Sequence, residues 1–302
     1  MVKKTMSQSP FSVVTVLGPG LLGGSVALAV RQFMPQCELR LWARREQPLE
    51  LARSMGIEHT YTDARQACEG SELIILATPI GVFEELSRSI LPAISKTALV
   101  TDVGSVKAYV HRTTGALLTD RGRKFIGSHP MAGSEKQGLE NAFPELLKNA
   151  TVVVTNPHGV PESDETRLEQ FWQLLGCSTY RMEPVNHDRT VARISHMPHI
   201  VSGLAARNAT VGNPRVADLQ RLASSGYRDT TRVSSGSSAM WADILWENDV
   251  AVREILHRCV DDLHRLVTLL ENQDKLGVRA WLDEAKNTRE LILQISENNP
   301  TD

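Results

Sequence analysis

The glycine-rich segment GPGLLG, residues 18–23, restricts the fold of this chain more than any other feature. It directly follows FSVVTVLG (11–18), a short apolar run that is typical of a buried parallel strand. A helical pattern comes next, from about Leu21 to Phe33. A glycine loop between a first strand and a first helix is the arrangement that binds the pyrophosphate of a dinucleotide, although a plain glycine-rich turn has the same pattern.

Each glycine of this loop has a separate use in a dinucleotide site. Gly18 allows the tight turn, Gly20 lets the backbone approach a pyrophosphate, and Gly23 lets the helix pack on the strand. The first helical residues, Leu21 and Leu22, add free N–H groups at the positive end of the helix dipole. We therefore expect these five residues to contact the cofactor.

Strands and helices alternate through the rest of the first half. Apolar runs predict strands at 38–43, 71–79, 97–104 and 123–130, and helical patterns occur at 48–55, at 80–90 and from about residue 105. This order predicts a parallel, doubly wound α/β sheet of the Rossmann type. Ligands of such sheets bind beyond the carboxyl ends of the strands, where we expect Thr78, Pro79 and Asp102 to contact the cofactor.

The end of the second strand indicates which dinucleotide is preferred. NAD sites usually carry an acidic residue about 20 residues after the glycine loop, where it binds the ribose 2′-hydroxyl. Here that strand ends in Trp42-Ala43-Arg44-Arg45, and no acid precedes Glu46. Two guanidinium groups suit a 2′-phosphate, so Arg44 and Arg45 favour NADP over NAD. The alternative is a solvated basic turn.

The second half of the chain is predicted to be helical. Two further strands at 150–157 and 177–182 enclose a helix at 164–175, and after Pro184 the patterns are helical at 186–209, 214–224 and 238–272, with a polar loop at 225–238. We therefore expect a dinucleotide-binding domain at 11–183 and an all-α domain at 184–298. The apolar face of the long helix predicts a homodimer formed through this helical domain.

Composition excludes several classes of function. The chain has 302 residues and a formal net charge of -2, which gives no reason to expect binding to nucleic acid or to an anionic membrane. No apolar stretch reaches the ~20 residues of a membrane span, and no signal peptide pattern is present. Four scattered cysteines without a Cys-x-x-Cys pair predict reduced thiols in a cytoplasmic protein.

Polar residues gather in three clusters along the chain. The first holds His129, Ser134 and Glu135, the second spans 187–199, and the third spans 227–232 with Trp241 beyond it. Any one histidine among them could equally be a structural residue. The spacing of His196 and His199 allows a metal, but no Cys or matching acid completes a ligand set, so we expect no metal site. An arginine in a Gly-Ser-Thr segment is a natural clamp for a carboxylate.

Several of these motifs together carry a family resemblance. They are GPGLLGGS, TDVGSVK (101–107), GSHPMAGSEKQG (127–138), NHD…SHMPH (186–199) and GYRDTTR…MWADI (226–244). From about residue 11 to about residue 295 the chain resembles the prephenate dehydrogenase family of tyrosine biosynthesis, which includes arogenate and cyclohexadienyl dehydrogenases. Motifs in the same order and with similar spacing are far more specific than the glycine loop alone.

The resemblance assigns roles to particular residues. It implies that His129 is the catalytic histidine that hydrogen-bonds the substrate's ring hydroxyl, and that Ser105 contacts both. It implies that Arg232 binds a substrate carboxylate and that His199 lines the substrate pocket. Further substrate contacts are expected from the same matched blocks, at Ser134, Glu135, His187, Ser195 and His196. Asp229 and Trp241 match positions that approach the neighbouring subunit's site, and the second domain matches a helical dimerisation domain.

The resemblance implies that the activity is oxidative decarboxylation of prephenate to 4-hydroxyphenylpyruvate, with hydride transfer to NAD(P). Arogenate dehydrogenase activity, giving tyrosine directly, is the alternative; His199 suits a keto acid and favours prephenate. A dehydrogenase of the 3-hydroxyacid type would need a lysine in the helical domain, where only Lys275 and Lys286 occur, both late in the chain. A dimeric redox sensor without activity is disfavoured by the intact set of His129, Ser105 and Arg232.

Overall fold

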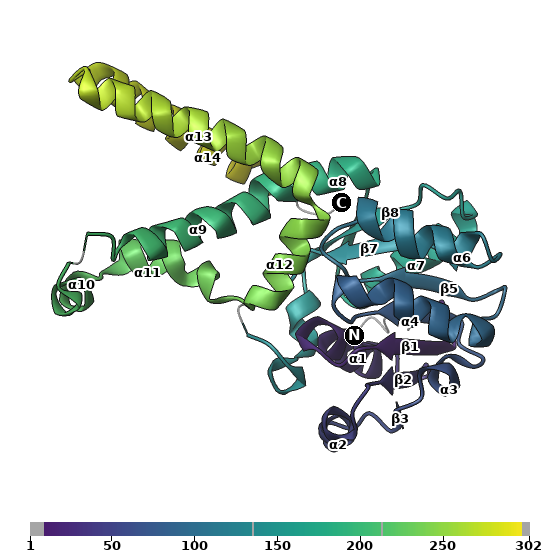
Figure 1. Cartoon of the computed structure of the whole chain (residues 1–302). Helices are drawn as coiled ribbons and strands as arrows, with labels where there is room; N and C mark the ends of the chain where they lie inside the picture. The colour runs from purple at the N-terminus through teal and green to yellow at the C-terminus, as the bar shows by residue number, and fades with distance from the viewer. Residues whose placement is uncertain (1–8, 135, 213, 298–302) are drawn as a thin grey trace, which may run out of the picture. The chain divides into compact units, whose positions relative to one another are not determined.

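The computed structural model describes residues 9–134, 136–212 and 214–297. Figure 1 labels most of its longer helices and strands. The chain divides into two compact units, one ending at Asp249 and one beginning at Val250. The boundary between residues 183 and 184, expected from the sequence, lies inside the first unit and stays a prediction.

A six-stranded parallel sheet forms the centre of the first unit, as expected. Its order is β3-β2-β1-β4-β5-β6. The strands are β1 (Val13–Leu17), β2 (Glu38–Trp42), β3 (His59–Tyr61), β4 (Leu73–Leu76), β5 (Leu99–Asp102) and β6 (Lys124–Phe125). Leu17 pairs with Trp42 and with Leu76, and Leu76 pairs with Asp102, so four carboxyl ends line one edge.

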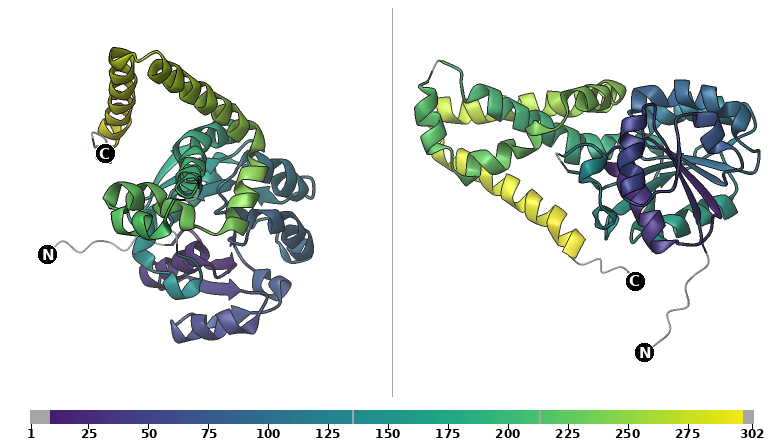
Figure 2. Two further views of the ribbon diagram at one scale, coloured as in Figure 1. Left: turned by 60° about the vertical axis from the view of Figure 1, so that its left-hand side comes forward. Right: turned by 90° about the horizontal axis from the view of Figure 1, so that it is seen from below.

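Helices cover both faces of this sheet (Figure 2). They are α1 (Leu21–Phe33), α2 (Glu46–Ser54), α3 (Ala64–Cys68), η1 (Ile80–Val82), α4 (Phe83–Ile90), η2 (Leu91–Ala93), α5 (Ala108–Val110), the π-helical η3 (His111–Gly115) and α6 (Ala116–Thr119). Alternate strand residues enter opposite cores. Val16 and Ile75 pack in a core that includes residues of α1, whereas Leu17 and Ile74 pack in a core that includes residues of α4 and α6. The doubly wound prediction is thereby confirmed.

The strand expected at 123–130 is wrong as a single element. It divides at Ile126, whose N–H donates to the carbonyl of Val100 as the last backbone-to-backbone bond to the large sheet. The chain then enters a second sheet of β7 (Gly127–Pro130), β8 (Thr151–Thr155) and β9 (Ser178–Arg181), with β7 antiparallel to β8. The short helices η4 (Leu139–Asn141) and η5 (Pro144–Leu147) and the longer α7 (Glu162–Leu174) connect these strands. His129 therefore lies on the second sheet.

The described residues that follow β9 are mainly helical. The elements are α8 (Pro184–Val191), the π-helical η6 (Ala192–His196), α9 (Met197–Asn208), α10 (Val216–Leu222), α11 (Ser225–Thr231), η7 (Arg232–Ser235), α12 (Ser238–Glu247), α13 (Asp249–Glu271) and α14 (Lys275–Glu297). In the second unit, Arg265 of α13 and Glu284 of α14 form an ion pair of 3.3 Å. Among the residues that the structure describes, no helix combines the length and apolar character needed to cross a membrane.

Two expectations for the helical half are wrong in detail. The polar loop expected at 225–238 is largely the helices α11 and η7, which pack on α9. The hydroxyl of Thr231 is accommodated inside the helix, where Oγ1 donates to the carbonyl of Tyr227 at 2.6 Å. The long helix expected at 238–272 breaks at Asn248, whose amide group donates to the carbonyl of Asp188 at 2.8 Å. That contact holds the end of α12 on α8.

Candidate active site

The glycine loop has the backbone geometry of a phosphate site. Gly18 has φ +121°, and a Cβ there would lie 2.7 Å from the carbonyl oxygen of Ala77. A Cβ on Gly23 would lie 2.1 Å from the carbonyl oxygen of Gly18, whereas a Cβ on Gly20 would have no neighbour within 4 Å. The helix α1 begins at Leu21 without a side-chain cap, which leaves its first N–H groups for a ligand to bind.

Residues at the ends of β4 and β2 complete the region expected to hold the cofactor. The hydroxyl of Thr78 is buried and lacks a hydrogen-bond partner in the described structure, and the neighbouring Pro79 is exposed. Arg44 and Arg45 are both exposed, and the carboxylate of Glu46 that follows them pairs with Arg53 at 2.5 Å. An open glycine loop, an unpartnered hydroxyl and two exposed guanidinium groups fit a dinucleotide.

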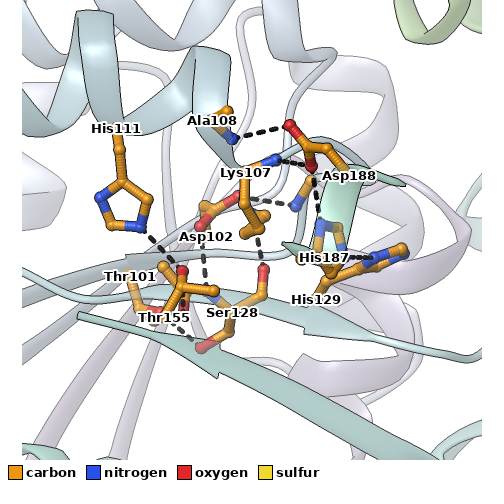
Figure 3. Close-up of polar contacts among 12 residues, drawn as sticks. Thr101, Asp102, Lys107, Ala108, His111, Ser128, His129, Thr155, His187 and Asp188 are labelled. Carbon is orange, nitrogen blue, oxygen red and sulfur yellow. Dashed lines mark hydrogen bonds and ion pairs between the residues drawn. The ribbon is translucent and has the colours of Figure 1, made fainter. Parts of the chain in front are cut away.

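His129 stands at the head of a chain of hydrogen bonds (Figure 3). Its Nδ1 lies 2.8 Å from Nε2 of His187, and Nδ1 of His187 lies 2.7 Å from Oδ1 of Asp188. The Asp188 carboxylate also accepts the backbone N–H groups of Lys107 at 2.8 Å and Ala108 at 2.9 Å. The relay His129–His187–Asp188 therefore joins the second sheet, α8 and the start of α5.

The relay assigns the tautomers of both rings. An ionised carboxylate only accepts hydrogen bonds, so Nδ1 of His187 carries the proton that it donates to Asp188. Nε2 of a neutral His187 is then an acceptor, and Nδ1 of His129 must donate to it. Nε2 of His129 is left with its lone pair, which is the atom a general base needs.

His129 is held in its neutral form. The residue is half-buried, and burial among the surrounding protein lowers the pKa of its imidazole well below the ordinary value. Any positive charge that His187, Lys107 or His196 takes up lowers the pKa of His129 further. Both effects disfavour the imidazolium, because each penalises a charge at this position.

An ion pair lies behind the relay. Lys107 Nζ binds the Asp102 carboxylate, and neither side chain has exposed surface. Burial raises the pKa of Asp102 and lowers that of Lys107, while the opposite charge of each partner resists the shift. The oxygens of Asp102 also accept the N–H groups of Gly104 and Ser128 at 2.9 and 3.1 Å. With the carboxylate so engaged, the cofactor contact expected of Asp102 stays a prediction.

Three of the residues predicted from the helical half, His196, His199 and Trp241, are joined by contacts between their rings. Nδ1 of His196 lies 3.2 Å from the amide nitrogen of Asn248, which binds the carbonyl of Asp188. His196 meets Trp241 edge-on at 6.0 Å between ring centroids, and His199 stacks on Trp241 at 3.6 Å. Trp241, expected near the neighbouring subunit's site, thus contacts two histidines of its own chain.

Other predicted residues lie outside these contacts. Ser105 is partly exposed in the turn between β5 and α5, two residues before Lys107. Arg232 is exposed on η7, which packs on α9, and Asp229 is exposed on α11. Ser195 is half-buried in η6, and exposed Ser134 accepts the N–H of Lys136 at 3.0 Å. The remaining predicted contact, Glu135, lies outside the described residues.

Three residues that the sequence reasoning did not assign to the site are central to it. Asp188 orients His187, Lys107 binds the Asp102 carboxylate, and Asn248 ties α12 to α8. A signal existed for two of them, since Asp188 and Lys107 stand inside the quoted motifs NHD and TDVGSVK. Within the described ranges, no three His, Cys, Asp or Glu side chains gather as a metal site.

Comparison with known proteins assigns the chain to a family. The prephenate dehydrogenase nucleotide-binding domain matches residues 26–180, and the prephenate dehydrogenase dimerization domain matches residues 183–284. A prephenate dehydrogenase of Bacillus subtilis (strain 168) is 30% identical over 285 residues, which cover 92% of this chain and 75% of the relative. The cyclohexadienyl dehydrogenase of Zymomonas mobilis is 28% identical over 273 residues, covering 87% and 90%.

Solved structures agree with that assignment. The prephenate dehydrogenase from A. aeolicus in complex with hydroxyphenyl propionate and NAD+ superposes with a TM-score of 0.85 at 25% identity, covering 93% of this chain and 98% of that one. The Synechocystis arogenate dehydrogenase superposes with a TM-score of 0.79 at 29% identity, covering 93% and 99%. This chain belongs to the prephenate dehydrogenase family and is an NAD(P)-dependent dehydrogenase.

Proposed function

We propose that this enzyme converts prephenate to 4-hydroxyphenylpyruvate and CO2, with NADP+ as its preferred hydride acceptor. The observation that carries the proposal is the relay His129–His187–Asp188, which leaves Nε2 of a neutral histidine available as a base. The relay contacts the β5–α5 turn through Lys107 and Ala108, and β5 ends at the sheet edge that carries the glycine loop.

In this reaction His129 accepts one proton from the substrate and later returns it. The hydroxyl at ring carbon C4 gives its proton to Nε2 of His129 as C4 loses a hydride, and the C1 carboxylate then leaves as CO2 so that the ring becomes aromatic. The imidazolium returns the proton to the phenolate oxygen, so no proton is gained or lost overall. A bound dinucleotide supplies the hydride acceptor. Asp188, acting through His187, stabilises the imidazolium between the two transfers.

Other residues bind and orient the substrate. Ser105 shares the hydroxyl with His129, and Arg232 holds a carboxylate in its planar fork. His199, Ser195 and His196 line the part of the substrate site that the helical half forms. The glycine loop, Thr78 and Pro79 hold the dinucleotide, and the backbone where β5 ends at Asp102 lies beside it.

Arg44 and Arg45 carry the preference for NADP. Both follow β2 directly and are exposed, where a 2′-phosphate of the cofactor would meet two guanidinium groups. We expect kcat/KM to be higher with NADP+, and Arg44→Ala/Arg45→Ala to lower it about tenfold or more with NADP+ while sparing NAD+. Arg88→Ala, which removes a guanidinium paired with Glu84 on α4, is the matched control. Higher kcat/KM with NAD+ in the unaltered enzyme contradicts the assignment.

The substrate is tested directly by following NADPH absorbance with prephenate and, separately, with arogenate. The proposal requires faster turnover of prephenate and a product identified as 4-hydroxyphenylpyruvate. Preference for arogenate would instead indicate arogenate dehydrogenase activity, for which the Synechocystis relative is named.

The helical half is proposed to form a cytoplasmic homodimer. The matching family model for residues 183–284 is described as a dimerization domain. Exposed apolar side chains recur along α13 at Val260, Leu263, Val267 and Leu270. A stripe of this kind on a long helix needs a partner to cover it. Light scattering at micromolar concentration should give twice the mass of the chain, and a monomer would contradict the proposal.

A further inference from the structure

We infer that Lys107 is a positioning residue for the reaction, because its side chain fixes the strand that carries His129 and its backbone fixes the carboxylate at the far end of the relay. The inference rests on the proposed function for its kinetic test. Its structural test does not involve a substrate.

The first contact lies next to His129 in the chain. Nζ of Lys107 donates to the carbonyl of Ser128 at 2.8 Å and binds the Asp102 carboxylate. That carboxylate accepts the N–H of the same Ser128 at 3.1 Å. Both backbone groups of the residue before His129 are therefore held by one pair, which sets where β7 places the imidazole (Figure 3).

The second contact lies at the other end of the relay. The backbone N–H of Lys107 donates to Oδ1 of Asp188 at 2.8 Å, beside the bond from Nδ1 of His187 to the same oxygen. Ala108 donates to the other oxygen at 2.9 Å. A shift of Lys107 would therefore displace both the base and the carboxylate that orients it.

The complete burial of the Lys107–Asp102 ion pair indicates that its role is to position the strand that carries His129. Lys107 and Asp102 are both 0% exposed, and apolar side chains of similar size often stabilise a fold as well as a buried ion pair does. The geometry gives the pair a use that apolar residues lack, since only it can bind both the N–H and the carbonyl of Ser128.

Besides positioning the strand, the charge of Lys107 affects the protonation of His129. The groups that face His129 are the ammonium of Lys107, the rings of His187 and His196, and the carboxylates of Asp102 and Asp188 behind them. Positive charge at Lys107 lowers the pKa of His129 and favours the neutral base. Removing that charge should therefore let His129 protonate at a higher pH.

The kinetic test compares Lys107→Met with Lys124→Met. Lys124 joins β6 to α7 through an ion pair of 2.7 Å with Asp164, outside the relay. We expect Lys107→Met to lower kcat about 10²-fold, the size of effect that a displacement of about 1 Å produces, and to leave KM within a few-fold. The acid limb of kcat should move to higher pH, and Lys124→Met should change neither.

The structural test uses imidazole nitrogen NMR of the protein without substrate. In the unaltered enzyme, His129 should carry its proton on Nδ1 and titrate well below about 6.5. In Lys107→Met it should titrate higher and become a mixture of tautomers. A variant with kcat within about twofold, an unmoved limb and an unchanged His129 resonance overturns the inference.

A second variant covers the case in which Lys107→Met does not fold. Asp102→Asn/Lys107→Met removes both buried charges, and circular dichroism melting shows whether it folds. If it folds, the same losses of kcat and of the Nδ1 tautomer are expected. If neither variant folds, the pair is a requirement of the sheet, and the positioning role is overturned. Failure of the unaltered enzyme to oxidise prephenate would refute the proposed function and leave the NMR test of Lys107 intact.

Discussion

The two ends of the proposed substrate site are built differently. At the base end, Asp102, Lys107 and Asp188 are 0%, 0% and 4% exposed, and each is held by hydrogen bonds that link several elements. At the carboxylate end, Arg232 and Asp229 are exposed on η7 and α11. The base is therefore fixed before a substrate arrives, whereas the proposed clamp lies at an exposed position.

This difference predicts a division of kinetic roles. A prearranged base acts on the charge that develops in the transition state, so its loss lowers kcat. An exposed clamp binds a carboxylate equally in the ground and transition states, so its loss raises KM. Variants at the two ends test whether the division is real.

The largest effect is expected for His129→Asn. Loss of the base should lower kcat by about 10²–10⁴-fold and leave KM similar, because a positioned general base contributes a factor of that size. Steady-state kinetics with prephenate measures both constants, and thermal unfolding checks that the variant is folded. Near-normal kcat in a folded variant would remove His129 from the mechanism.

A smaller loss is expected for Asp188→Asn. The amide can donate to Nδ1 of His187, which would place the proton of His187 on Nε2, facing His129. His129 would then accept at Nδ1 and lose its free lone pair at Nε2. We expect kcat to fall about 10²-fold, as for a misplaced catalytic group.

Asp164→Asn is the matched control for this variant. Asp164 is a buried carboxylate paired with Lys124, away from the relay. The Asp164→Asn variant should keep the kcat of the unaltered enzyme. Equal losses in both variants would show that the effect of Asp188 is one of stability alone.

The base end was also the part that sequence could predict only in outline. His129 and His187 are expected at the site from their motifs, but the single strand expected at 123–130 is wrong, and His129 lies on the second sheet. Their mutual contact was not expected, because 58 residues separate them. Asp188 and Lys107 are 81 residues apart, and nothing in the local pattern of either indicates the other.

Local composition misled at the carboxylate end. Ser, Gly and Thr at 225–238 favour a loop because their side chains compete for backbone hydrogen bonds, yet α11 forms there because it packs on α9. At β7 the sequence does not show that one expected strand is divided between two sheets. Both halves of 123–130 are compatible with a strand, and only the bond from Ile126 to Val100 shows where the first sheet ends.

The carboxylate end is tested by Arg232→Ala. Losing a charged hydrogen-bonding partner costs about 1.5–3 kcal/mol, so KM for prephenate should rise about 10- to 100-fold while kcat changes little. Arg228→Ala removes another exposed arginine one turn earlier on α11 and serves as a comparison for general charge effects. An unchanged KM in Arg232→Ala would take the clamp out of the proposal.

The finest test of the comparison is the acid limb of kcat. His129 acts only when neutral, and burial together with the neighbouring positive charges lowers its pKa below the ordinary value of about 6.5. As pH falls, kcat should therefore stay level through 6.5 and drop only below it. Arg232→Ala should share this limb, because the clamp lies outside the relay, even though its KM is higher at every pH. A limb at or above 6.5 in the unaltered enzyme would mean that the relay does not hold His129 neutral, and a limb that moves in Arg232→Ala would mean that the two ends are coupled.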